Sequence, residues 1–123
     1  MVVASYDPDP RSYDHPVTKR HLAILETATD ATGRKLEVAV IEGPRTIRKS
    51  SGIDDFAAGY LNFYLCNGAV IAPEFGDAKA DRAARDTLQT LYPTRQVVQL
   101  NIDGIAAGGG GIHCTTQQEP SVS

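Results

Sequence analysis

The chain has few of the residues from which several classes of protein are built. Its 123 residues include two cysteines, three histidines, one methionine and no tryptophan. Two cysteines can form neither a disulfide framework nor a four-cysteine zinc site, so we expect reduced thiols and no bound metal. A chain of this length is enough for one domain, or for one part of a larger domain.

Clustered positive charge and long apolar runs are also missing. The formal net charge is -3, and the basic residues are scattered along the chain. Nucleic-acid and anionic-membrane surfaces depend on clustered cations, so we expect neither of these partners. No stretch reaches the roughly 20 apolar residues of a transmembrane helix, and the first residues lack the layout of a signal peptide. These absences predict a cytoplasmic protein.

The hydrophobic pattern of the first half predicts an α/β fold. Residues 1–16 contain three prolines and no clear alternation, so we expect an extended lead-in there. Residues 17–29 have apolar side chains at helical spacing, and residues 35–41 alternate like a strand. Residues 42–58 are expected to form a long loop, and loops of that length are often functional.

The second half contains the strongest local signals. Asn67-Gly68 is typical of a tight hairpin turn between two β-rich runs. Asp77 is expected to cap a helix that ends near Leu91. A strand over residues 96–102 and a last strand over residues 111–115 complete the pattern.

These elements suggest a repeat. Residues 17–41 correspond to the end of one unit, residues 60–102 to one complete ββαβ unit, and residues 108–116 to a strand that carries a candidate nucleophile. A chain that begins and ends inside repeats leaves strand edges bare. We therefore expect these edges to be covered by a second copy of the chain, as a homo-oligomer, or by a missing N-terminal part.

The candidate nucleophile is Cys114, in the stretch GGGGIHC over residues 108–114. A lone cysteine is more often a packed residue, and we interpret Cys66 in this way. The glycine run around Cys114 is either a flexible loop or a backbone that approaches a ligand closely. It is no phosphate loop, because no Gly-Lys-Ser/Thr follows, and His113 occupies the place of a glycine that a dinucleotide fingerprint needs.

The chain shows no evident base for this thiol. On a strand, His113 would point away from the face of Cys114, so we interpret His113 as support for the strand. His15 and His21 have no motif around them and are expected at the surface. A cysteine protease would need a histidine in a suitable context, and none follows Cys114. A small-ligand or phosphate-binding module built on the glycine run is the other contender.

Three longer stretches carry a family resemblance: PVTKRHLAILETATDATGRKLEV, YLNFYLCNGAVIAPEFGD and YPTRQVVQLNIDGIAAGGGGIHCTTQQEP. Together they cover nearly the whole chain, which resembles the C-terminal third of agmatine deiminases, in the Porphyromonas-type peptidylarginine deiminase family. The resemblance implies a partial pentein-type α/β propeller, with about two ββαβ units of a five-bladed fold. Residues 108–111 match the glycine run of the family, although many members carry Asn at the position of Gly111.

The resemblance also implies a reaction. The cysteine that matches Cys114 attacks the guanidinium carbon of agmatine, ammonia leaves, and water releases N-carbamoylputrescine from an amidino-thioether, in the synthesis of putrescine. No cofactor is needed, and Gly109, Gly110 and Gly111 are expected to position the substrate.

Part of that machinery is not found in this sequence. The general acid/base histidine of the family lies in a Gly-His-x-Asp type segment, which does not occur here, and its guanidinium-binding acids lie mainly upstream. Since positioned acid/base groups contribute on the order of 10² to 10⁴ in rate, we expect little or no activity from the isolated chain. A non-catalytic, self-associating remnant and a fragment acting on peptidyl-arginine are the alternatives.

Overall fold

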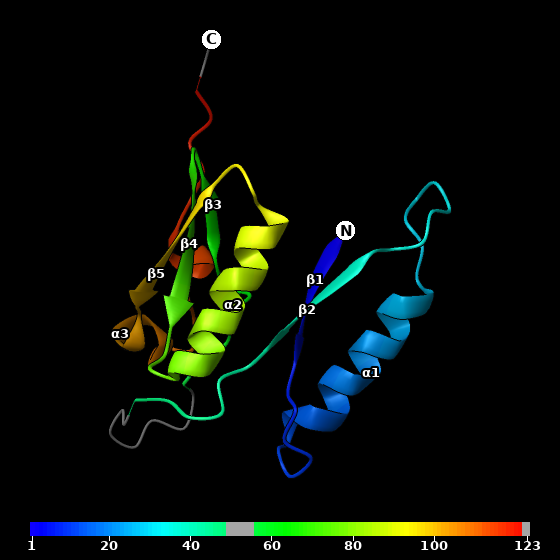
Figure 1. Cartoon of the computed structure of the whole chain (residues 1–123), viewed down its shortest axis with the longest axis horizontal. Helices are drawn as coiled ribbons and strands as arrows, with labels where there is room; N and C mark the ends of the chain where they lie inside the picture. Colours follow the sequence, from blue (N-terminus) through cyan, green and yellow to red (C-terminus); the bar gives the residue numbers. More distant parts are fainter. Residues whose placement is uncertain (49–55, 122–123) are drawn as a thin grey trace.

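The computed structural model describes residues 1–48 and 56–121, and its elements form two groups that lie side by side (Figure 1). The first group contains α1 and a two-stranded sheet, and the second contains α2 and a three-stranded sheet. The α/β class is therefore confirmed. Within the described residues, no helix is both long and apolar enough to cross a membrane. The elements are β1 (Val2–Tyr6), α1 (Asp14–Thr27), β2 (Val38–Glu42), β3 (Tyr64–Cys66), β4 (Ala69–Glu74), α2 (Ala78–Leu91), β5 (Gln96–Asn101), α3 (Asp103–Ala106) and the 3₁₀ helix η1 (His113–Thr115).

The first group corrects the expectation for residues 1–16. Strand β1 lies in this segment and pairs in parallel with β2, with Val2 opposite Val38. Helix α1 begins at Asp14, where Pro16 still falls in the first turn and so removes no helical hydrogen bond. The prediction of an extended lead-in without a strand is therefore wrong for residues 2–6, which become a strand through their pairing with β2.

The second group follows the ββαβ order in the chain. Strands β3 and β4 form the antiparallel hairpin predicted at Asn67-Gly68, and Gly68 has a φ of 77° in the turn. Strand β4 then pairs in parallel with β5, with Ala69 opposite Gln96, so the sheet order is β3-β4-β5. The parallel pair needs a crossover, which α2 provides.

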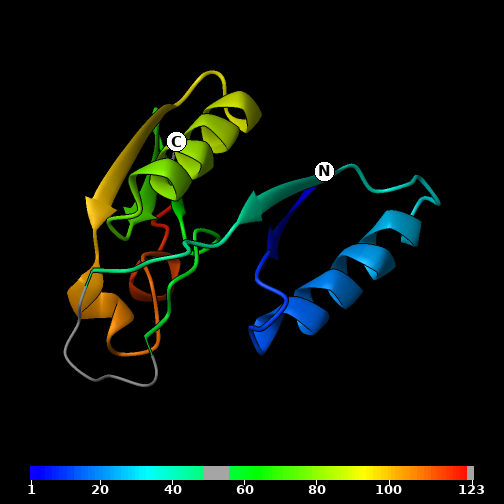
Figure 2. The same cartoon turned by 60° about the horizontal axis from the view of Figure 1, so that its bottom comes forward.

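Helix α2 of the second group packs against both sheets. The Asp77 carboxylate caps it by accepting hydrogen bonds from the backbone N–H groups of Lys79 and Ala80, as predicted. Ala84 and Leu88 are fully buried on its inner face. The helix contacts β2 on one side and β4 and β5 on the other, which Figure 2 shows from a second direction.

The predicted long loop begins as an ordered connection. Over residues 43–48 the chain has no helix or strand, and Arg48 ends this stretch with ion pairs to Glu74 at 2.8 Å and Asp103 at 2.7 Å. These two acids lie at the end of β4 and the start of α3, so the connection is tied to one edge of the second group. Residues 49–55 of the predicted loop lie outside the described residues.

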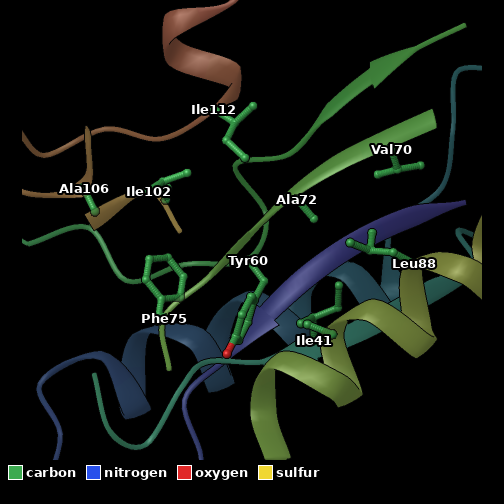
Figure 3. Close-up of a cluster of buried hydrophobic side chains, with 10 residues drawn as sticks. Ile41, Tyr60, Val70, Ala72, Phe75, Leu88, Ile102, Ala106 and Ile112 are labelled. Atoms are coloured by element: carbon green, nitrogen blue, oxygen red, sulfur yellow. The ribbon is translucent and has the colours of Figure 1, made fainter. Parts of the chain in front are cut away.

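The core draws on both groups (Figure 3). Ile41 of β2 packs with Leu88 of α2, and Tyr60 lies against Phe75 with ring centroids 5.4 Å apart. One buried charge lies here: the Asp81 carboxylate accepts hydrogen bonds from the Tyr60 hydroxyl at 2.7 Å and from the Phe75 N–H at 2.9 Å. The core therefore fixes residue 60, two residues before the site described below.

The strand predicted within residues 108–116 is wrong. The described structure has a tight turn there, followed by η1. The hydroxyls of Thr115 and Thr116 donate to backbone carbonyls three and four residues earlier, which favours a helical turn over a strand ladder. Glycines add no side-chain contacts that would hold a strand.

Candidate functional site

The glycine run forms a defined turn between two buried anchors. Ala106 and Ile112 are buried on either side of it, and the N–H of Gly109 donates to the carbonyl of Ala106 at 3.0 Å. Gly109 has a φ of 78°, in the left-handed region that favours glycine. The turn delivers Cys114 to the middle of η1, where its side chain is exposed.

The last two glycines of the run lie close to the cysteine and to a residue far away in the chain. A Cβ on Gly110 would lie 3.6 Å from the Cβ of Cys114, an ordinary contact. A Cβ on Gly111 would lie 2.4 Å from the Cγ of Asn62, closer than real atoms approach. Gly111 is thus required for packing, because the amide of Asn62 occupies the space of its missing side chain.

Asn62 holds Cys114 through both ends of its amide. Its Oδ1 accepts a hydrogen bond from the backbone N–H of Cys114 at 3.2 Å, and its Nδ2 donates to the Sγ at 3.0 Å. The Nδ2 donor lowers the pKa of Cys114, and the backbone N–H of Gly111 lowers it further. The site therefore favours the thiolate, the form that acts as a nucleophile.

Sequence reasoning missed Asn62. It lies 52 residues from Cys114, and although the stretch YLNFYLCNGAVIAPEFGD carries the family resemblance, nothing in it links Asn62 to the cysteine. The only available signal is that it is a polar residue in the otherwise apolar run YLNFYL.

His113 has a different place from the one predicted. It cannot support a strand, because the described structure has none at this position, and its side chain is exposed. Its backbone N–H donates to the carbonyl of Asn62 at 3.4 Å, which adds a contact between the two segments. His113 also lines an open cleft of about 510 Å³, whose other lining residues are Ser5, Asp14, Phe56, Ala57, Ala58, Gly59, Leu61 and Asn62.

The other predicted residues lie apart from this site. His15 is half-buried, against expectation, and its Nδ1 donates to the carbonyl of Asp7 at 2.7 Å, whereas His21 is exposed. Cys66 is half-buried in β3, in agreement with a packing role. In residues 1–48 and 56–121, no histidine hydrogen-bonds to Cys114, and no group of three histidine, cysteine or acidic residues could hold a metal ion.

Comparisons with known proteins place the chain among its relatives. A protein of Streptomyces avermitilis is 41% identical over 120 residues, which cover 98% of this chain and 34% of the relative. The agmatine deiminase of Medicago truncatula is 36% identical over 140 residues, again covering 98% of this chain and 37% of that protein. The chain thus spans about a third of the length of the curated relatives it matches.

A solved structure and a family match complete the comparison. The agmatine deiminase of Enterococcus faecalis superimposes with a TM-score of 0.86 at 32% identity, over 96% of this chain and 36% of that one. Residues 1–120 match the Porphyromonas-type peptidyl-arginine deiminase family. Since this match covers nearly the whole chain, the protein belongs to the Porphyromonas-type peptidyl-arginine deiminase family.

Proposed function

We propose that this chain is the nucleophile-bearing part of an agmatine deiminase, and that Cys114 attacks the substrate. The observation that carries the proposal is the exposed thiol of Cys114, whose pKa is lowered by the Asn62 amide. A thiolate is the form required for attack on carbon. The choice of substrate is supported by the names of relatives from a plant and from Enterococcus faecalis.

The reaction has two halves. The Cys114 thiolate adds to the guanidinium carbon of agmatine, and the bond from that carbon to one terminal nitrogen breaks, so that this nitrogen takes a proton and leaves as ammonia. Water then adds to the carbon of the amidino-thioether, the carbon–sulfur bond breaks, and N-carbamoylputrescine leaves while the thiolate is restored. The electrophile is the cationic substrate itself, so we propose no cofactor.

The residues of this chain contribute the nucleophile and its surroundings. Gly110 lies against Cys114 without a side chain, so in this proposal a flat guanidinium group can approach the thiol there, with Gly109 and Gly111 as its neighbours in the turn. The neighbouring cleft carries the carboxylate of Asp14, which favours a cationic ligand. Together these groups suit a planar cation better than an anion.

The remaining machinery belongs, in this proposal, to other parts of a complete five-bladed propeller, of which this chain supplies about two ββαβ units. A histidine that protonates the leaving ammonia would come from an upstream unit, as would further carboxylates for the guanidinium group. We therefore expect the 123-residue chain alone to turn over agmatine very slowly, and its bare strand edges to pair with those units or with a second copy.

Selective labelling of Cys114 tests the proposal with a reagent that needs no acid/base residue to react. The cationic reagent 2-chloroacetamidine resembles one end of a guanidinium group and loses chloride unaided, and 2-chloroacetamide is its neutral counterpart. Rates at Cys114 and Cys66 are measured by peptide mass spectrometry and normalised to free cysteine. We expect the amidinium to prefer Cys114, agmatine to slow this labelling, and Cys114→Ser to abolish it.

Two results would contradict or redirect the proposal. Equal normalised rates for the two reagents at Cys114, without protection by agmatine, would remove the case for a guanidinium site. Protection by an arginine-containing peptide but not by agmatine would instead favour peptidyl-arginine as the substrate, the activity after which the family is named.

A further inference from the structure

The segment that carries Asn62 is fixed on both sides by aromatic side chains. Tyr60 is 1% exposed and donates its hydroxyl to the Asp81 carboxylate. On the other side, the ring of Phe63 contacts that of Tyr92 with centroids 6.0 Å apart. The backbone of Asn62 therefore has little freedom to carry its side chain away from Cys114.

The orientation of the Asn62 amide is fixed by the chemistry of its partners. A backbone N–H can only donate, so the atom that faces the N–H of Cys114 must be Oδ1. The NH₂ group then points to the Sγ as a donor. A donor to sulfur favours the thiolate, because the thiolate accepts hydrogen bonds more strongly than the thiol does.

Gly111 makes this arrangement possible. Its φ is not in the left-handed region, so the backbone alone does not demand glycine. The demand comes from Asn62, three of whose side-chain atoms would lie within 2.8 Å of an added Cβ. With any larger residue at position 111, the Asn62 side chain or the backbone around it has to shift, which disturbs the contact between the amide and the thiol.

From this geometry we propose that Asn62 is the positioning residue of the nucleophile: its amide orients the Cys114 side chain and stabilises the thiolate, and Gly111 provides the space for it. The proposal rests on Cys114 as the nucleophile of the proposed function. It assigns to this chain the activation of the thiol, for which the sequence offers no histidine partner.

The test measures the thiolate itself. In a Cys66→Ala background, Cys114 is the only thiol, and its rate of alkylation by iodoacetamide is measured from pH 5 to pH 10. We expect the midpoint of this profile to move to higher pH in Asn62→Ala, and further in Asn62→Asp, whose carboxylate repels a thiolate. Alkylation at pH 7 should slow by roughly threefold to tenfold, because the exposed thiolate loses one hydrogen bond of ordinary net strength.

Gly111→Ala provides an independent approach to the same contact. It leaves Asn62 in the sequence but displaces its amide, so the midpoint should move in the same direction. Gly43→Ala is its matched control, since an added Cβ there meets no atom within 4 Å. Asn101→Ala is the control for loss of an amide, because Asn101 is exposed and bonds to the N–H of Asp103 instead.

The outcomes separate this inference from the proposed function. An unchanged midpoint in folded Asn62→Ala, or an equal shift in Asn101→Ala, would overturn the inference. If Asn62→Ala does not fold, the midpoint of Asn62→Asp tests the inference instead, because the aspartate side chain is nearly isosteric with asparagine and keeps the acceptor for the N–H of Cys114. A shifted midpoint without preference for 2-chloroacetamidine would leave Asn62 as a positioning residue and reject the guanidinium substrate instead.

Discussion

The buried carboxylate of Asp81 offers the sharpest test of how the fold holds the site. Asp81 is 7% exposed and accepts hydrogen bonds from the Tyr60 hydroxyl, the Phe75 N–H and the Gly76 N–H. The change Asp81→Ala removes all three acceptor contacts at once. Because Tyr60 lies two residues before Asn62, the same change loosens the segment that reaches Cys114.

The cost follows from which donors lose contact with water. Gly76 is exposed, so its N–H can bind water after the substitution. The hydroxyl of Tyr60 and the N–H of Phe75 belong to residues that are almost fully buried. At roughly 1 to 3 kcal/mol for each buried donor without a partner, Asp81→Ala should lower the free energy of unfolding by about 2 to 6 kcal/mol.

Urea denaturation followed by far-UV circular dichroism measures this difference. Asp86→Ala is the matched control, because Asp86 lies on the same helix with an exposed side chain and should change stability by no more than about 0.5 kcal/mol. In the double variant with Tyr60→Phe, one orphaned donor is gone, so the loss should be smaller than the sum of the single losses. Equal losses in Asp81→Ala and Asp86→Ala would refute the reasoning.

Three further predictions concern single residues. Burial, followed by the Asp81 hydrogen bond, raises the pKa of Tyr60 above its usual 10.0, so the free energy of unfolding should fall as the pH rises beyond about 10. Tyr60→Phe should reduce this dependence of the unfolding free energy on pH, as measured by urea titrations, and an equal dependence in both proteins would contradict the prediction. Asp77→Ala should lower the free energy of unfolding by about 1 kcal/mol, because it removes the cap of α2. Backbone N–H groups, first that of Ala80, lower the pKa of Asp77, so this loss should vanish in acid, where the carboxylate is protonated. A constant loss down to pH 2 would argue against the cap. Gly109→Ala should destabilise the chain by about 1 kcal/mol, whereas Gly43→Ala, at ordinary φ, should not; equal effects in thermal melts would exclude strain.

The sequence was informative wherever structure depends on neighbours in the chain. The Asn67-Gly68 turn and the Asp77 cap were both predicted, because each depends on one or two residues that contact their own backbone. Strand β1 was missed for the opposite reason. Its five residues have no distinct alternation, and only pairing with β2, more than 30 positions later, makes them a strand.

The site shows the same division. The candidate nucleophile Cys114 was found from local residues, and its exposure agrees with that role. The strand around it was wrong, because threonine hydroxyls that bond back to the chain favour η1. Asn62 could not be found in this way, since its contact with Cys114 exists only after folding has brought the second group together.

The covalent intermediate is the most direct test of the central claim, that Cys114 attacks a guanidinium carbon. The purified chain and Cys114→Ser are incubated for hours with millimolar agmatine, quenched in acid and analysed by intact and peptide mass spectrometry, beside an assay for ureido product. We expect a small fraction of the chain to gain the mass of agmatine less ammonia, located on Cys114 and absent from the serine variant, because the acid that assists the loss of ammonia belongs to the upstream units of the proposal. An adduct of this mass on Cys66 alone, or an equal adduct in the serine variant, would contradict the account.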